Sequence, residues 1–251
     1  MTDKIKIKIS SFVANILEND ALRFGFTKND KSNKNALLNK LIPTLVEVRK
    51  ARRSEIENIL KNEYCREDSE NIYNAVNTVI DKVYFSDDEL NVLDEYIWIR
   101  PSKENACVYD EIETSETLLT AQDVSVYIRG LLNEYSRLPQ YKREVLVFDN
   151  ELDVFSDACY TRRILHFKDK ETDKRYKAFA FTYCYGYLYE QTNYCVIYDI
   201  EECKIKSIAL HSIQDVYSIK QKFTPDDELI KLLQEYTEEC NFENEVIVEM
   251  K

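Results

Sequence analysis

The segment Lys4-Ile5-Lys6-Ile7-Lys8-Ile9-Ser10 alternates charged and apolar side chains along almost its whole length. Successive side chains of a β-strand point to opposite faces, so the alternation predicts a strand with one cationic face and one apolar face. A two-stranded ribbon is narrow enough to enter the major groove of DNA, which makes this segment a candidate nucleic-acid reader. An edge strand that lysines protect against aggregation has the same pattern, and the segment alone favours that second interpretation.

Two helices are expected directly after this strand. Apolar side chains recur at helical spacing over residues 11–24, and Gly25 supplies the left-handed residue that commonly ends a helix. Ser10 or Ser11 is the expected N-cap of the first helix, and Asn33 is the expected N-cap of the second. A polar loop joins the two helices.

The order of strand, helix, polar loop and helix within about fifty residues resembles a ribbon-helix-helix domain. Two chains contribute one strand each in such domains, so the resemblance implies a homodimer in which Lys4, Lys6 and Lys8 face nucleic acid. The second helix starts at about Lys34, and Pro43 predicts a kink or a break within it. Its first turn offers backbone N–H groups either to a cap or to a phosphate, and both roles remain open for Asn33, Lys34 and Asn35.

The charge of the chain is unevenly distributed. The net charge is −12, yet residues 1–62 hold 13 Lys/Arg and 7 Asp/Glu, a net of +6. The remainder holds 21 basic and 39 acidic residues, a net of −18. Because the local field decides where a polyanion binds, contact with nucleic acid is expected at the amino-terminal segment and disfavoured elsewhere.

The sequence lacks the patterns of catalytic and metal sites. The seven cysteines form no CxxC pair, which favours reduced thiols and a cytoplasmic location. Three glycines are too few for a phosphate-cradling loop, and the two histidines, His166 and His211, stand far apart. No signal peptide or membrane span is expected, because no long apolar run occurs. We therefore expect no enzymatic activity, no cofactor and no metal.

The fold class is predicted to be α+β, in four regions. These are a ribbon-helix-helix at 1–62, a helical middle region at 63–149, a small β-barrel at 150–220 and a C-terminal extension at 221–251 with one helix and one strand. The middle region is expected to hold helices at 68–84 and 121–136, a strand at 95–100 and a polar linker at 102–118. Five short strands are expected in the barrel, at 161–168, 174–184, 186–191, 193–199 and 204–210.

The carboxy-terminal half resembles a WYL-domain protein. Val154 to Ala158 corresponds to the helix that precedes the first strand of that domain, and Arg162 to Phe167 corresponds to the strand itself. Asn193-Tyr194-Cys195 stands at the Trp-Tyr-Leu position and keeps only the central tyrosine. Ala209 to Ile213 stands at the last motif, where both arginines of the family pattern are replaced.

This resemblance carries specific expectations. WYL domains adopt an Sm-like barrel and are proposed to sense nucleotides or nucleic acid. A subgroup that joins a ribbon-helix-helix to a WYL domain includes accessory proteins of type VI-D CRISPR systems, which bind single-stranded RNA and modulate an RNA-guided effector. The residues expected to bind a ligand or nucleic acid here are Arg162, Arg163, Lys177, Tyr194, Lys206 and His211.

Three functions follow from these features. The first is a non-enzymatic, homodimeric regulator that binds single-stranded RNA beside a CRISPR effector. The second is a DNA-binding transcriptional regulator whose ribbon reads a two-fold operator and whose WYL domain senses a ligand. The third is a protein-interaction scaffold, in which the ribbon only dimerises the chain and the acidic body binds a basic partner. If the protein shows no salt-dependent binding to RNA or to DNA, the scaffold function is favoured over the other two.

Overall fold

The computed structural model describes residues 4–63, 92–114, 124–186, 191–239 and 245–248. The chain divides into two compact units, Met1–Leu138 and Pro139–Lys251. The fold mixes helices with sheets, as predicted, but the helix expected at 68–84 lies outside the described residues. Within the described ranges, no helix has the length and apolar character that crossing a membrane requires.

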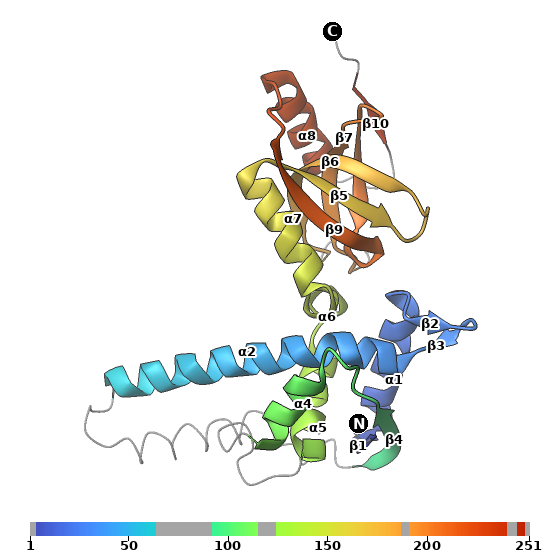
Figure 1. Cartoon of the computed structure of the whole chain (residues 1–251), viewed down its shortest axis with the longest axis vertical. Helices are drawn as coiled ribbons and strands as arrows, with labels where there is room; N and C mark the ends of the chain where they lie inside the picture. The colour runs from blue at the N-terminus through green and yellow to red at the C-terminus, as the bar shows by residue number, and fades with distance from the viewer. Residues whose placement is uncertain (1–3, 64–91, 115–123, 187–190, 240–244, 249–251) are drawn as a thin grey trace. The chain divides into compact units, whose positions relative to one another are not determined.

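The amino-terminal unit packs helices against a two-stranded sheet (Figure 1). The sheet consists of β1 and β4, and β2 and β3 form a separate hairpin between the first two helices. Its elements are β1 (Ile5–Ser10), α1 (Ser11–Arg23), β2 (Thr27–Lys28), β3 (Lys31–Ser32), α2 (Lys34–Glu63), β4 (Leu93–Ile99), α4 (Ala106–Thr114) and α5 (Val124–Arg137).

The amino-terminal strand is confirmed, but its partner differs from the expected one. β1 pairs antiparallel with β4 of the same chain, with Ile5 opposite Ile99 and Ile7 opposite Ile97. This pairing replaces the expected ribbon of two chains, because residues 93–99 supply a second strand with the same apolar alternation. The homodimer was inferred from the need for a second strand, and β4 meets that need within one chain.

The caps of α1 agree with the sequence pattern. The Ser10 hydroxyl accepts a hydrogen bond from the Val13 N–H at 3.3 Å, and Gly25 has a φ of 72° just after the helix. The Phe26 N–H then donates to the Ala21 carbonyl at 2.7 Å, which closes the C-terminal cap. α2 continues as one helix through Pro43 to Glu63, so a break at that proline is not observed.

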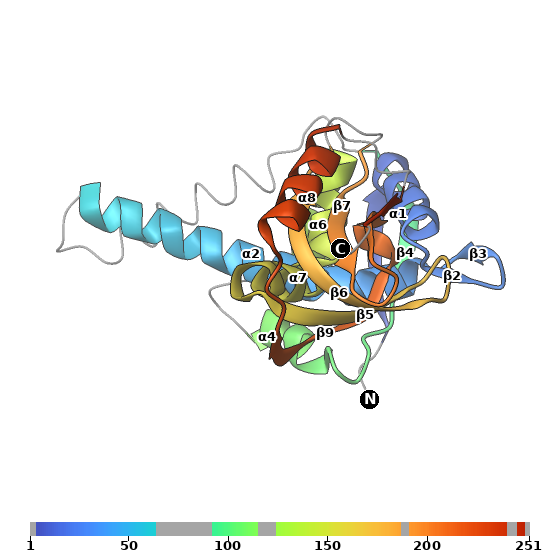
Figure 2. The ribbon, with the colours of Figure 1, turned by 90° about the horizontal axis from the view of Figure 1, so that it is seen from above.

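The carboxy-terminal unit is built around a six-stranded sheet with the strand order β10-β8-β7-β6-β5-β9. Figure 2 labels β5, β6, β7 and β9 of this sheet. α7 packs against β5, β6 and β9, and α8 packs against β7. Its elements are α6 (Gln140–Val147), α7 (Asp149–Thr161), β5 (Arg163–Asp169), β6 (Arg175–Cys184), β7 (Tyr194–Asp199), β8 (Lys204–Ala209), the 3-10 turn η1 (Leu210–Ser212), β9 (Ile213–Lys222), α8 (Asp227–Glu239) and β10 (Val246–Ile247).

The expected strands map onto this sheet with two differences. Four of the five expected strands correspond to β5, β6, β7 and β8. The fifth, at 186–191, falls mostly on residues outside the described ranges. β9 was not expected from the sequence. Its exposed positions are polar, and only the short 3-10 turn η1 separates it from β8. The expected helix and terminal strand of the extension are present as α8 and β10.

Buried polar groups fix α6 to the sheet. Glu144 is 1% exposed, and its carboxylate accepts hydrogen bonds from the Asn193 backbone N–H at 2.9 Å and from the Asn193 side-chain amide at 2.7 Å. His211 Nδ1 lies 2.6 Å from the same carboxylate. Asn193 also donates to the Tyr141 carbonyl and accepts from the Gly186 N–H. One fully buried amide therefore joins a helix, a loop and a strand.

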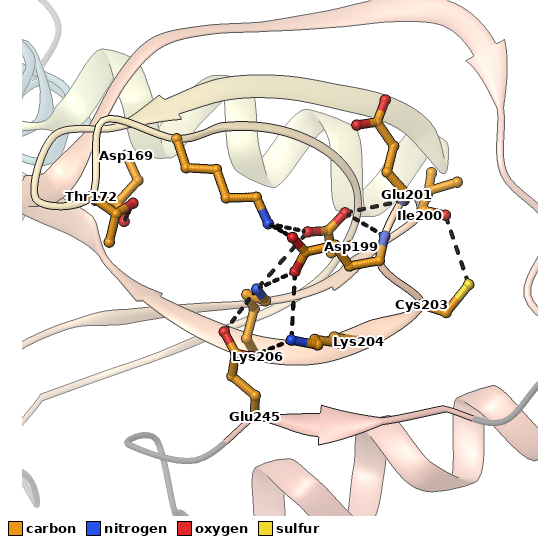
Figure 3. Close-up of polar contacts among 11 residues, drawn as sticks. Asp169, Thr172, Asp199, Ile200, Glu201, Cys203, Lys204, Lys206 and Glu245 are labelled. Carbon is orange, nitrogen blue, oxygen red and sulfur yellow. Dashed lines mark hydrogen bonds and ion pairs between the residues drawn. The ribbon is translucent and has the colours of Figure 1, made fainter.

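A second polar cluster attaches the C-terminal segment to the sheet (Figure 3). Lys206 is 4% exposed, and its ammonium group lies 2.9 Å from Glu245 and 3.9 Å from the buried Asp199. Lys204 lies 2.9 Å from Glu245 as well. The hydrogen bonds from these two lysines hold the pKa of Glu245 at about 2, below its usual 4.5.

We predict that Glu245→Gln lowers the stability of the carboxy-terminal unit near neutral pH and that this loss disappears in acid. A carboxylate whose pKa is lowered by folding stabilises the folded state above its unfolded pKa. That contribution falls away as the pH drops from about 4.5 to about 2. Thermal unfolding of both proteins at several pH values measures it, and a difference that does not change with pH would contradict the assignment.

We predict that Asn193→Ala destabilises the same unit by about 2–4 kcal/mol, because buried partners on Glu144, Tyr141 and Gly186 lose their hydrogen bonds. Urea unfolding measures the loss. Asn150→Ala, at an exposed position in the first turn of α7, is the control and should change stability by less than about 0.5 kcal/mol. Equal effects of the two substitutions would refute the role of Asn193.

Candidate nucleic-acid interface

The exposed face of the β1–β4 ribbon combines lysines with aromatic rings. Lys6 stands opposite Trp98 and Lys8 stands opposite Tyr96 in the antiparallel register. The alternation places these side chains, with Lys4, on the face that points away from the helices. We call this set of five residues the ribbon face.

The lysines and the rings of the ribbon face contact one another. The Lys6 ammonium lies 4.0 Å from the Tyr96 ring centroid and 5.4 Å from that of Trp98. Lys4 lies 5.6 Å from Trp98, and Lys8 lies 5.9 Å from Tyr96. Both rings are nevertheless 51% exposed, and all three lysines are exposed, so the face is open to a ligand.

The opposite face of the ribbon holds it in place. Ile7, Ile9 and Ile99 are 0% exposed, and Ile97 is 6% exposed. They pack towards α1, α2 and α5, and the Arg129 side chain of α5 donates a hydrogen bond to the Lys8 carbonyl at 2.7 Å. Burial of each isoleucine stabilises the fold by roughly 1.5–3 kcal/mol. An isolated two-stranded ribbon is only marginally stable, so this packing keeps the outer face rigid.

A rigid surface of this composition suits unpaired bases. Exposed aromatic side chains stack on the faces of bases, and neighbouring cations attract the phosphates. Tyr96 and Trp98 are two residues apart on one strand and so lie about 7 Å apart along it. Aromatic pairs on a sheet surface stack successive bases in the same manner in common RNA-binding modules.

The start of α2 uses its polar residues for structure. The Asn33 side chain accepts a hydrogen bond from the Ala36 N–H at 3.2 Å, so Asn33 is the N-cap. The Lys34 ammonium lies 2.6 Å from Glu18, and hydrogen bonds from Lys34 and Ser32 lower the pKa of that carboxyl. The Asn35 side chain accepts from the Arg100 N–H at 2.7 Å, just after β4. The structure thus gives each of the three a partner within the unit.

The residues expected to bind a ligand in the WYL resemblance lie on different elements and have different partners. Arg162 follows α7 in a left-handed conformation, with a φ of 56°, and Arg163 lies 3.7 Å from Asp157. Tyr194 packs against the apolar core under α8. Lys206 belongs to the ion-pair cluster with Glu245, and His211 contacts the buried Glu144.

Lys177 lies in a different environment. It stands opposite His166, which in turn stands opposite Tyr217, so the three form a row across β6, β5 and β9. The rings of His166 and Tyr217 are stacked, with centroids 5.3 Å apart, and Tyr217 is 51% exposed. Among the described residues, Lys177 makes no ion pair.

Sequence reasoning missed Tyr96 and Trp98 as site residues. Glu95-Tyr96-Ile97-Trp98-Ile99-Arg100 was identified as a strand, and its alternation of aromatic and aliphatic residues was visible. The missing information was the pairing of this strand with residues 5–10, which lie more than eighty positions away.

Within the described ranges, no group of three or more His, Cys, Asp or Glu side chains could hold a metal ion.

Comparison with known proteins supports the fold alone. No family model matches this sequence, and no curated protein matches it either. Among solved structures, the chain is similar to one described as "Crystal structure of a CRISPR Cas-related protein". The TM-score is 0.68 and the sequence identity is 11%, over 96% of this chain and 72% of that chain.

Proposed function

We propose that this protein is a non-enzymatic RNA-binding accessory of a CRISPR system, and that the ribbon face binds single-stranded RNA. The observation that carries the proposal is the combination of two half-exposed aromatic rings with three exposed lysines on one rigid ribbon. The solved structure of similar fold is described as a CRISPR Cas-related protein, and the proposed CRISPR setting is taken from that description. The resemblance of both halves of the sequence to an accessory subgroup points the same way.

Stacking of a base on an aromatic ring is more favourable than the lysine–ring contact that it would replace. A cation–π contact at an exposed site contributes about 0.5–1 kcal/mol, whereas stacking of a base on an aromatic ring contributes about 1–3 kcal/mol. An incoming strand can therefore displace the lysines from the rings and gain stacking. The displaced ammonium groups remain beside the phosphates, so their charge continues to contribute to binding.

A DNA-binding transcriptional regulator is the second candidate. The observation that favours this function is a two-stranded ribbon with lysines on its outer face, because a ribbon of two strands fits into the major groove. Its rings, however, have no unstacked base to meet in an intact duplex. Homodimerisation remains a prediction for both candidate functions. The scaffold function requires that the protein binds neither RNA nor DNA.

We predict that Trp98→Ala and Tyr96→Ala each weaken binding of single-stranded RNA by about 1–3 kcal/mol, or roughly 5- to 150-fold. Fluorescence anisotropy with a labelled oligouridine measures this. Tyr160→Ala, which removes a 91% exposed ring from α7, is the control. Because Trp98 is the only tryptophan of the chain, its fluorescence should also be quenched by single-stranded RNA in the unlabelled protein. Tighter binding of duplex DNA without quenching would support the second candidate instead.

We predict that Lys6→Gln reduces the salt dependence of RNA binding. Each phosphate contact on a single strand contributes about 0.7 to the slope of log affinity against log salt concentration. The substitution should lower the slope by about that amount, because Lys6 is the lysine that contacts both rings. Lys231→Gln, on the exposed face of α8, should leave the slope unchanged. An unchanged slope in Lys6→Gln would show that Lys6 does not contact a phosphate of the bound RNA.

A further inference from the structure

The β2–β3 hairpin contributes almost nothing to the core of its unit. Residues 27–31 are all exposed, and Ser32 is half-buried. In both views the hairpin projects from the end of α1 away from the rest of its unit (Figure 1 and Figure 2). A segment that buries no apolar side chain does not stabilise the fold by packing, so its order has another cause.

Local hydrogen bonds make the hairpin rigid. Asn29 and Asp30 both have positive φ, 53° and 59°, as a two-residue type I′ turn requires. At the base, the Asn33 N–H donates to the Phe26 carbonyl at 2.7 Å. The Ser32 hydroxyl donates to Glu18 of α1 at 2.6 Å.

The hairpin also places two like charges directly opposite each other. Lys28 pairs with Lys31 in the antiparallel register, beside the turn. Like charges at directly opposite positions destabilise a sheet. Asp30 does not relieve this, since among the described residues neither lysine forms an ion pair with it or with any other carboxylate. Natural sequences depart from such local rules mainly at functional sites.

We propose that Lys28 and Lys31 bind a phosphate of the same nucleic-acid strand whose bases stack on the ribbon face. This inference rests on the proposed function and adds a second, backbone-directed contact to it. A phosphate between the two ammonium groups converts their repulsion into two attractive contacts. α1 separates the hairpin from the ribbon, and its 13 residues span roughly 20 Å. A stacked strand advances about 3.4 Å per nucleotide, so about six nucleotides reach from one contact to the other.

The test compares the full-length protein with the variant Lys28→Gln/Lys31→Gln on oligouridines of about three and about twelve nucleotides. On the longer oligonucleotide, the variant should bind roughly three- to tenfold more weakly, and its salt slope should fall by about 0.7, the contribution of one phosphate. On the shorter one, wild type and variant should bind equally, because that strand cannot span both contacts. Lys220→Gln/Lys222→Gln removes the same charge from exposed positions of β9 and is the matched control.

Folding stability provides the second readout. Removal of the opposed charges should leave the thermal unfolding midpoint unchanged or raise it, whereas a merely structural role for the lysines predicts a lower midpoint. Equal binding of the longer oligonucleotide by wild type and variant overturns the proposal, as does an equal loss in the control. If Trp98→Ala loses binding while the hairpin variant does not, the ribbon function stands and the hairpin contact fails. If the wild type binds neither oligonucleotide, both fail.

Discussion

The structure of the amino-terminal unit depends on the antiparallel pairing of β1 with β4. The pairing brings the isoleucines of the two strands to one face, where Ile7, Ile9 and Ile99 are fully buried. Because side chains alternate along each strand, burial of this face leaves Lys6 and Trp98 on the other. The exposed ribbon face is therefore a direct consequence of core packing, and its geometry is as rigid as the core that supports it.

Much of this arrangement could be predicted from local sequence. The alternation over residues 4–10 gave the strand and its two faces, and Ser10 and Gly25 gave the limits of α1. These features depend on nearest neighbours along the chain. The pairing of β1 with β4 does not depend on nearest neighbours, because α1, α2 and residues outside the described ranges separate the two strands. The rings of the candidate site were missed for that reason, although the strand that carries them was recognised.

The carboxy-terminal unit shows a different limit of sequence reasoning. Lys206 was expected to face a ligand, yet it is buried beside Glu245 and Asp199. A lysine on a strand has the same local pattern whether it meets a ligand or an internal carboxylate. In a unit with more acidic than basic residues, an internal carboxylate partner is readily found. Arg162 and Lys177 differ from Lys206, since neither forms an ion pair among the described residues, and Lys177 stands opposite His166, whose ring stacks on Tyr217.

Two local conflicts occur in the amino-terminal unit. Trp98 and Tyr96 are half-exposed where apolar rings would gain free energy from burial, and Lys28 faces Lys31 where an opposite charge would stabilise the pair. Neither conflict is relieved within the described part of the unit. A single-stranded polyanion relieves both at once, because its bases cover the rings and its phosphates neutralise the lysines. One ligand thus accounts for two features that the folding of the chain alone leaves unexplained.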